Sequence, residues 1–268
     1  MTRLFSALCL TALSALPLAA QSGHTQPAVA QVMPGWVQPN GNRVVGLHIK
    51  LAPGWKTYWR APGDAGIPPR FDWSRSRNLR GVAISWPTPG VYPQNGMRTI
   101  GYKDEVVIPV TIAPRNPGKP VRLRVGLDIG VCEDICVPYQ MEVSAVLDST
   151  DTKPTPAIAA ALADRPYSGA EAGVRAAVCK LSPKGDGMEI EARLSMPSTG
   201  GREVVVIEPG QPGLWMSETD VARSGGTLTA TGDLVPTSGS AVAIDRSAIT
   251  ITVLGAQRAV EIKGCAPG

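Results

Sequence analysis

The sequence contains few histidines, few aromatic residues and little net charge. It has 2 His, 5% aromatic residues, and 26 Lys and Arg against 22 Asp and Glu, a net charge of +4. Two histidines give a poor basis for an imidazole zinc site or a Ser-His-Asp triad. The small positive charge does not indicate nucleic-acid binding. The Gly-rich loop at 62–66 has no Lys or Ser/Thr of a phosphate-binding loop, so no nucleotide or other cofactor is expected.

Long apolar runs are absent after the first twenty residues. Within those twenty, Arg3 precedes a mostly apolar stretch at 4–18, and two small residues, Ala19 and Ala20, follow. This pattern predicts a cleaved signal peptide at 1–20, with an uncleaved anchor as the alternative. Residues 21–268 are expected to be exported and to have no stable membrane insertion.

Alternation with a period of two predicts an all-β chain. In the first half it covers 45–51, 106–112, 121–128 and 141–147, where Pro109 indicates an edge strand or a bulge. In the second half it covers 188–194, and further strands are expected at 204–207, 227–231, 241–244, 249–253 and 260–262. Many short strands between Pro- and Gly-rich turns favour two immunoglobulin-like β-sandwich domains.

A polar segment with two prolines separates the halves. The expected division is a first immunoglobulin-like domain at 21–148, a linker at 149–170 and a second β-sandwich at 171–268. Within the linker, Thr155 is predicted to cap a short helix over 156–163, with Pro156 at its first position. The stretch 169–178 is predicted as a second short helix or a loop.

Four cysteines follow the predicted signal peptide: Cys132, Cys136, Cys179 and Cys265. An even number in an exported protein indicates disulfides. A Cys132–Cys136 ring would contribute about 2 kcal/mol of chain-entropy stabilisation, against about 4.6 kcal/mol for a Cys179–Cys265 ring. The long bridge therefore suits a permanent structural disulfide, and the short one suits a bond that is easier to reduce.

Two other interpretations of Cys132 and Cys136 remain open from spacing alone. The pair is also compatible with a structural disulfide in a turn. A third possibility is a Cu(I) site, since copper(I) accepts sulfur ligands and Met97 or Met141 would add a thioether. No zinc or other defined metal site is predicted.

The first half resembles the N-terminal periplasmic domain of DsbD-type thiol–disulfide interchange proteins and the related domain of ScsB-type proteins, which are linked to copper tolerance. The resemblance is carried by four segments in order: 54–66 (GWKTYWRAPGDAG), 71–73 (FDW), 100–112 (IGYKDEVVIPVTI) and 131–138 (VCEDICVP). It implies a periplasmic immunoglobulin-like domain whose Cys132 and Cys136 exchange electrons as a protein-disulfide reductase. Cys136 is expected to attack and Cys132 to resolve.

The resemblance also implies partners and a covered site. A membrane-embedded thiol-electron transporter (DsbD-core or CcdA-like) would supply electrons, and oxidised periplasmic thioredoxin-fold proteins would accept them. The stretch 92–102 corresponds to a cap, and the expected cap or wall residues are Tyr58, Trp59, Tyr92, Met97 and Tyr102. A transmembrane core and a thioredoxin-like domain are not recognisable in this chain, so the electron source is expected on another polypeptide. The alternatives are a non-catalytic binding or chaperone-like module with structural disulfides, and a Cu(I)-handling protein.

Overall fold

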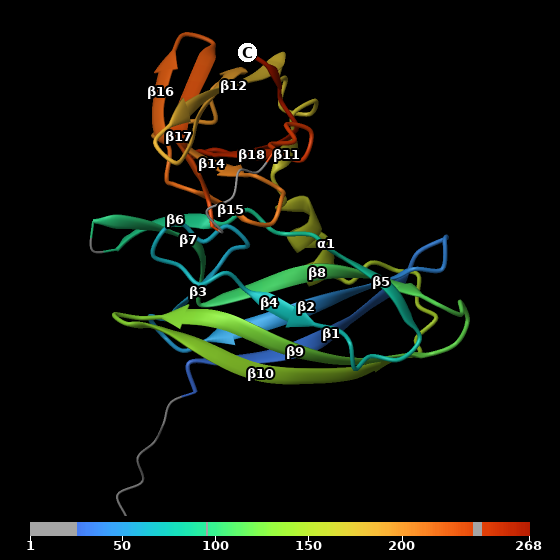
Figure 1. Ribbon diagram of the computed structural model, residues 1–268. Helices are drawn as coiled ribbons and strands as arrows, with labels where there is room; N and C mark the ends of the chain where they lie inside the picture. Colours follow the sequence, from blue (N-terminus) through green and yellow to red (C-terminus); the bar gives the residue numbers. More distant parts are fainter. Residues whose placement is uncertain (1–25, 95, 238–242) are drawn as a thin grey trace, which may run out of the picture.

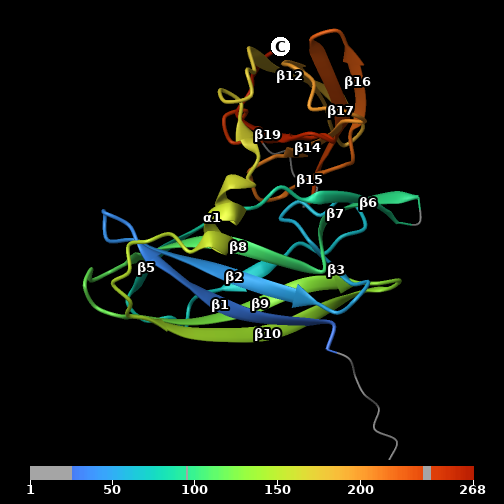
Figure 2. The same cartoon turned by 180° about the vertical axis from the view of Figure 1, so that it is seen from behind.

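The computed structural model describes residues 26–94, 96–237 and 243–268, and these build two domains placed one above the other (Figure 1). The predicted signal peptide and His24 lie outside the described residues. Within the described part of the chain, no helix is long and apolar enough to cross a membrane. Figure 2 shows from behind that α1 and the β6–β7 hairpin lie where the two domains meet.

The first domain is a sandwich of two sheets. One sheet has the order β1 (Ala28–Val37), β2 (Arg43–Leu51), β8 (Glu105–Pro114), β5 (Leu79–Ile84). The other has the order β10 (Cys136–Leu147), β9 (Val121–Cys132), β3 (Lys56–Tyr58), β7 (Met97–Lys103), β6 (Gly90–Gln94), and β4 (Arg70–Asp72) also pairs with β9.

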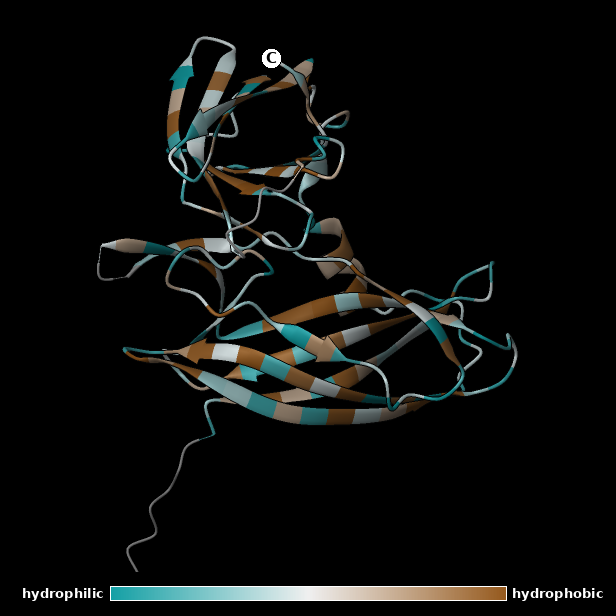
Figure 3. Ribbon diagram, in the orientation of Figure 1, coloured by the Kyte–Doolittle hydropathy of each residue, from teal (hydrophilic) through white to brown (hydrophobic). Residues whose placement is uncertain are grey.

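Strand β9 shows why these segments form a sandwich. Its alternate residues Val121, Leu123, Val125, Leu127, Ile129 and Val131 are buried in the core. Between them, Arg122 and Arg124 are exposed. The same banding is visible as alternating brown and teal along the strands in Figure 3. Period-two patterning therefore fixes which face of the strand meets the opposite sheet.

The second domain is also a sandwich. One sheet has the order β11 (Tyr167–Ser168), β19 (Ala259–Lys263), β18 (Thr250–Leu254), β14 (Val204–Glu208). The other has the order β15 (Leu214–Met216), β17 (Thr227–Pro236), β13 (Gly187–Ser195), β12 (Ala176–Lys184), β20 (Ala266–Pro267), and β16 (Asp220–Ser224) also pairs with β17. The prediction of an all-β chain with two β-sandwich domains is confirmed.

The linker contains one helix, α1 (Pro156–Ala163), at the predicted position. Thr155 stands at its N-cap, but its hydroxyl donates to the Pro34 carbonyl (3.0 Å) rather than to the helix. Ile158 is fully buried, and a Cβ built on Gly46 would lie 3.0 Å from its Cγ1. The helix therefore packs closely on β2 at a residue without a side chain.

Two local expectations are wrong. Pro109 lies on β8, which pairs with β2 on one side and β5 on the other, so it is not on an edge strand. Of the predicted strand 241–244, the described residues Ala243 and Ile244 are outside any strand. The stretch 169–178, expected as a short helix or a loop, is a loop of turns over 169–175, and β12 starts at Ala176.

Candidate functional site

Cys132 and Cys136 face each other at the closed end of the β9–β10 hairpin. Cys132 is the last residue of β9, Cys136 is the first of β10, and the two form the final antiparallel pair before an exposed three-residue turn. They are disulfide-bonded, with their Cα atoms 4.1 Å apart. Antiparallel pairing holds opposite Cα atoms about 4.5–5.5 Å apart, so the strands themselves bring the two cysteines together.

The two sulfur-bearing residues differ in accessibility. Cys132 is completely buried, whereas Cys136 is half-buried at the start of the outer strand. In the turn and just beyond it, Ile135 is 76% exposed and Val137 is 38% exposed. The hairpin therefore presents Cys136 to solvent, flanked by apolar side chains.

Tyr58 lies directly beside the disulfide. Its hydroxyl donates to Cys136 Sγ at 2.8 Å, and its ring packs against Gly130, where a Cβ would come within 2.6 Å of the ring. Burial raises the pKa of Tyr58 above its ordinary value of 10, so the hydroxyl keeps its proton at neutral pH. The absence of a side chain at Gly130 thus lets a proton donor reach the half-buried sulfur.

Acidic residues lie in the turn of the β9–β10 hairpin, and basic residues lie on the neighbouring strands β3 and β7. Glu133 and Asp134 are exposed in the turn, and Lys56 is paired with Cys132 across β3 and β9. The ammonium groups of Lys56 and Lys103 lie 5.8 and 5.0 Å from the centre of the Tyr92 ring. Burial raises the pKa of Tyr92. Tyr92 therefore lies beside the strands that carry the site, held by two cations.

The other expected wall residues occupy different environments. Trp59 is fully buried in the core, and Tyr102 is buried with its hydroxyl donating to the Pro87 carbonyl (2.9 Å). Met97 is 46% exposed in the β6–β7 hairpin. Among the contacts that the structure describes for these five residues, the hydrogen bond to the disulfide is made by Tyr58.

The second cysteine pair is located in the second domain. Cys179 on β12 is fully buried and is disulfide-bonded to Cys265, with a Cα separation of 5.6 Å. The bond joins the first long strand of this domain to the segment between β19 and β20. Among the described residues, no group of three or more His, Cys, Asp or Glu side chains is arranged to hold a metal ion.

The residues that connect the two domains are not among the site residues expected from the sequence. Arg60 follows Tyr58 by two positions and binds Glu208 (2.8 Å) and Glu261 (2.6 Å) of the second domain. Arg98 binds Glu218 (2.6 Å). These partners are 120 to 201 positions apart, and single charged residues give no signal of such pairing. The run of apolar residues at 204–207 was the available clue, because it indicates a strand buried on both faces.

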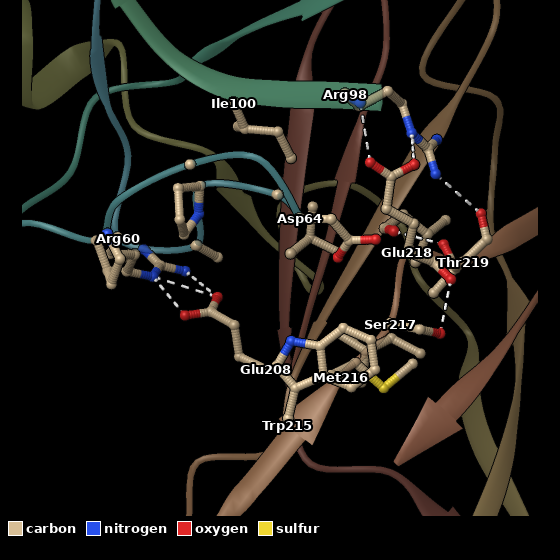
Figure 4. Close-up of a pocket in the computed structure, with 18 of the residues that line it drawn as sticks. Arg60, Asp64, Arg98, Ile100, Glu208, Trp215, Met216, Ser217, Glu218 and Thr219 are labelled. Atoms are coloured by element: carbon tan, nitrogen blue, oxygen red, sulfur yellow. Dashed lines mark hydrogen bonds and ion pairs between the residues drawn. The ribbon is translucent and has the colours of Figure 1, made fainter. Parts of the chain in front are cut away.

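A cavity of about 440 Å³ lies between these ion pairs. Figure 4 shows Arg60 with Glu208 on one side of it and Arg98 with Glu218 on the other, with Asp64, Trp215 and Met216 also lining it. Burial, together with the neighbouring Glu218 charge, raises the pKa of Asp64.

Comparison with known proteins identifies the domain that carries the hairpin. Residues 25–148 match the family described as thiol:disulfide interchange protein DsbD, N-terminal. This stretch is a DsbD N-terminal domain. The match covers the Cys132–Cys136 hairpin, Tyr58 and the β6–β7 hairpin, and it places the domain in a thiol–disulfide interchange family.

Solved structures extend the comparison beyond the DsbD N-terminal domain. The N-terminal periplasmic domain of ScsB from Proteus mirabilis matches with a TM-score of 0.65 and 22% identity, over 90% of this chain and 92% of that one. The two-domain fold is thus shared. The reduced N-terminal domain of Neisseria meningitidis DsbD matches with 18% identity, over 41% of this chain and 82% of that one, at a TM-score of 0.24, too low to support a conclusion. No curated protein matches the chain.

Proposed function

We propose that this protein is a periplasmic thiol–disulfide exchange protein that works through Cys132 and Cys136. A membrane-embedded thiol-electron transporter of the DsbD-core or CcdA-like type would reduce the pair. The dithiol would then reduce oxidised periplasmic thioredoxin-fold proteins. The observation that carries the proposal is the disulfide at an accessible hairpin end, with the Tyr58 hydroxyl on Cys136 Sγ, in a DsbD N-terminal domain.

The proposed reaction consists of two exchanges. The Cys136 thiolate attacks one sulfur of the partner's disulfide, a mixed disulfide forms, and the partner's other sulfur leaves as a thiolate. The Cys132 thiolate then attacks Cys136 Sγ, and the partner's remaining thiolate leaves. Two electrons have passed to the partner, and the Cys132–Cys136 bond is re-formed. The transporter's dithiol restores the reduced pair by the same steps in reverse.

The exposure of the two cysteines supports these roles. Cys136 is half-buried and reachable, as an attacking residue must be, whereas the fully buried Cys132 is placed to react only with its neighbour. The protonated Tyr58 hydroxyl would stabilise a Cys136 thiolate by a charge-assisted hydrogen bond. The exposed Ile135, in the turn between the two cysteines, offers a small apolar surface on which a partner can dock.

The two disulfides differ in what they contribute to stability. The Cys132–Cys136 bond closes a ring with a sequence separation of 4, and its ends are already held together by β9–β10 pairing. The Cys179–Cys265 bond spans a separation of 86. In the chain-entropy model these rings are worth about 2 and about 4.6 kcal/mol. Opening the first therefore costs the fold less, as a cycling bond requires.

A redox titration of the protein without residues 1–20 tests the proposal. The protein is equilibrated in dithiol buffers, and alkylation of each cysteine is resolved by mass. We expect Cys132 and Cys136 to be reduced together between roughly −270 and −120 mV, while Cys179 and Cys265 stay oxidised. If both pairs resist reduction to below about −300 mV, the first bond is structural, and a non-catalytic binding module replaces the exchange function.

A further inference from the structure

The second domain binds the β6–β7 hairpin, which corresponds to the expected cap. Three hydrogen bonds come from Arg98: its backbone N–H donates to Glu218 Oε1 (3.0 Å), its Nε to Glu218 Oε2 (2.6 Å), and its Nη2 to the Thr219 carbonyl (3.2 Å). Both ion-pair side chains are about three-quarters buried, at 26% and 27% exposure. Figure 4 shows the Glu218 carboxylate directed at the Arg98 backbone and side chain.

The segment that carries Glu218 is braced on both sides. The neighbouring Ser217 exchanges two hydrogen bonds with Asp233 of β17, each 2.9 Å long. On the other side, the buried Thr219 hydroxyl donates to the Val205 carbonyl of β14 (2.6 Å). Glu218 is therefore held by two strands of the second domain, and it offers Arg98 a preformed acceptor rather than a mobile one.

The second domain is in turn fixed to the first. Alternate residues of β14 point opposite ways: Val205 and Ile207 belong to the core of the second domain, while Val204 and Val206 pack with the core of the first. Arg60 adds its ion pairs to Glu208 and Glu261. Because the second domain is fixed in this way, Glu218 holds the hairpin at a set position relative to the body of the first domain, which carries the disulfide.

The β6–β7 hairpin lies against the second domain. Gly96, Met97 and Arg98 line a groove whose other wall is formed by residues of the second domain, including Glu203 and Glu218. In both Figure 1 and Figure 2 the β6–β7 hairpin and the cysteine end of β9–β10 project from the same side of the first domain, with the β6–β7 hairpin nearer the second domain. The base of the hairpin is joined to the site, because β7 pairs with β3 and β3 pairs with β9 at Cys132.

We propose that Glu218 is a positioning residue, and that the second domain uses it to hold the hairpin tip away from the Cys132–Cys136 bond. The part of the proposal that concerns reaction rates rests on the proposed function. Once Arg98 is released, the hairpin can move and bury the half-exposed Met97 against the exposed Ile135 in the turn between the two cysteines. Covering the disulfide in this way slows attack on it by a protein thiol.

Glu218→Ala and Arg98→Ala test the proposal in the two-domain protein. Hydrogen exchange is followed for residues 90–103, and the second-order rate of Cys132–Cys136 reduction is measured with reduced thioredoxin. We expect hairpin protection to fall by about threefold or more and the rate to fall by about threefold to tenfold, as for loss of a coupling contact. The double variant is expected to match each single one.

Glu189→Ala is the matched control, because it also removes the acidic partner of an ion pair in the second domain but touches neither the hairpin nor the domain boundary. It is expected to leave both readouts unchanged. The exchange of charges in Arg98→Glu with Glu218→Arg is expected to restore part of the protection and of the rate. Unchanged hairpin exchange in folded Glu218→Ala, or an unchanged or faster reduction, overturns the proposal. If the wild-type bond is not reduced at all, the proposed function fails, and hydrogen exchange alone still decides whether Glu218 holds the hairpin.

Discussion

The most specific residue-level feature of the site is the hydrogen bond from the Tyr58 hydroxyl to Cys136 Sγ. We predict that Tyr58→Phe slows alkylation of Cys136 at neutral pH in the reduced protein by about tenfold. A hydrogen bond to a charged group is worth about 1.5 kcal/mol or more, and its loss reduces the population of thiolate. The measurement is the rate of iodoacetamide reaction at Cys136 as a function of pH.

Tyr167→Phe is the matched control for this substitution. Tyr167 is half-exposed on β11 of the second domain, so the same hydroxyl is lost without a change near the cysteines. Equal alkylation profiles for Tyr58→Phe and wild type would mean that the tyrosine only packs against Gly130 and has no part in activating the sulfur.

At the residue scale, some features of the site can be predicted from the sequence and others cannot. Tyr58 was included among the expected wall residues because of the resemblance to the DsbD family, and the structure gives it a direct contact with Cys136. Arg60, two positions later, was not singled out. Its role depends on Glu208 and Glu261, which belong to the second domain and meet Arg60 at the boundary between the two domains. Contacts that arise from docking leave no periodic pattern in the sequence.

At the scale of elements, helix α1 attaches the linker to the first domain. We predict that Ile158→Ala destabilises the protein by about 2–4 kcal/mol, because the side chain is fully buried and its removal leaves a cavity above Gly46. The measurement is a denaturant unfolding curve. Ala157→Ser, at an exposed position of the same helix, is expected to change stability by less than about 0.5 kcal/mol. Equal stability of the two variants would show that the helix does not anchor the linker.

Helix α1 and the strands were predictable to different degrees. Pro156 and the alanines specified the helix, and regular alternation specified β9, because each of these signals is local. Strand β15, with three residues, and β16, whose apolar content is low, have too few alternating positions to be recognised. The missing N–H of Pro109 indicates an edge strand from the sequence, but β8 has neighbouring strands on both sides.

At the scale of the whole molecule, strands β14 and β18 of the second domain are covered on both faces. Strand β18 has no exposed residue: Ile251 and Val253 enter the core of the second domain, and Leu254 packs with the core of the first. Its sequence TITVL has no charged residue and consists of apolar or β-branched side chains, as suits a strand that is covered on both faces. The two sandwiches therefore form a joined unit, and the charged groups at their boundary are partly withdrawn from water.

Glu261 makes this boundary sensitive to acid. Burial by itself would raise the pKa of Glu261, but the charges and hydrogen bonds of Arg60 and Lys263 outweigh it and hold the pKa below its ordinary value of 4.5. A carboxylate with a lowered pKa stabilises the folded state above the unfolded pKa, and this contribution is lost as the pH falls through the folded pKa. Asp64, whose pKa is raised, acts in the opposite direction, and its contribution is lost as the pH rises.

We therefore predict that Glu261→Gln lowers the free energy of unfolding by about 1 kcal/mol at pH 7 and has a smaller effect below pH 4.5. The measurement is a series of denaturant unfolding curves from pH 3 to 7 for wild type and variant. Glu189→Gln, which removes an exposed partner of Lys184 away from the boundary, is the control and is expected to change little at any pH. If wild type and Glu261→Gln lose stability in parallel as the pH falls, the ionised Glu261 does not hold the two domains together, and the apolar face of β14 and β18 must account for their docking.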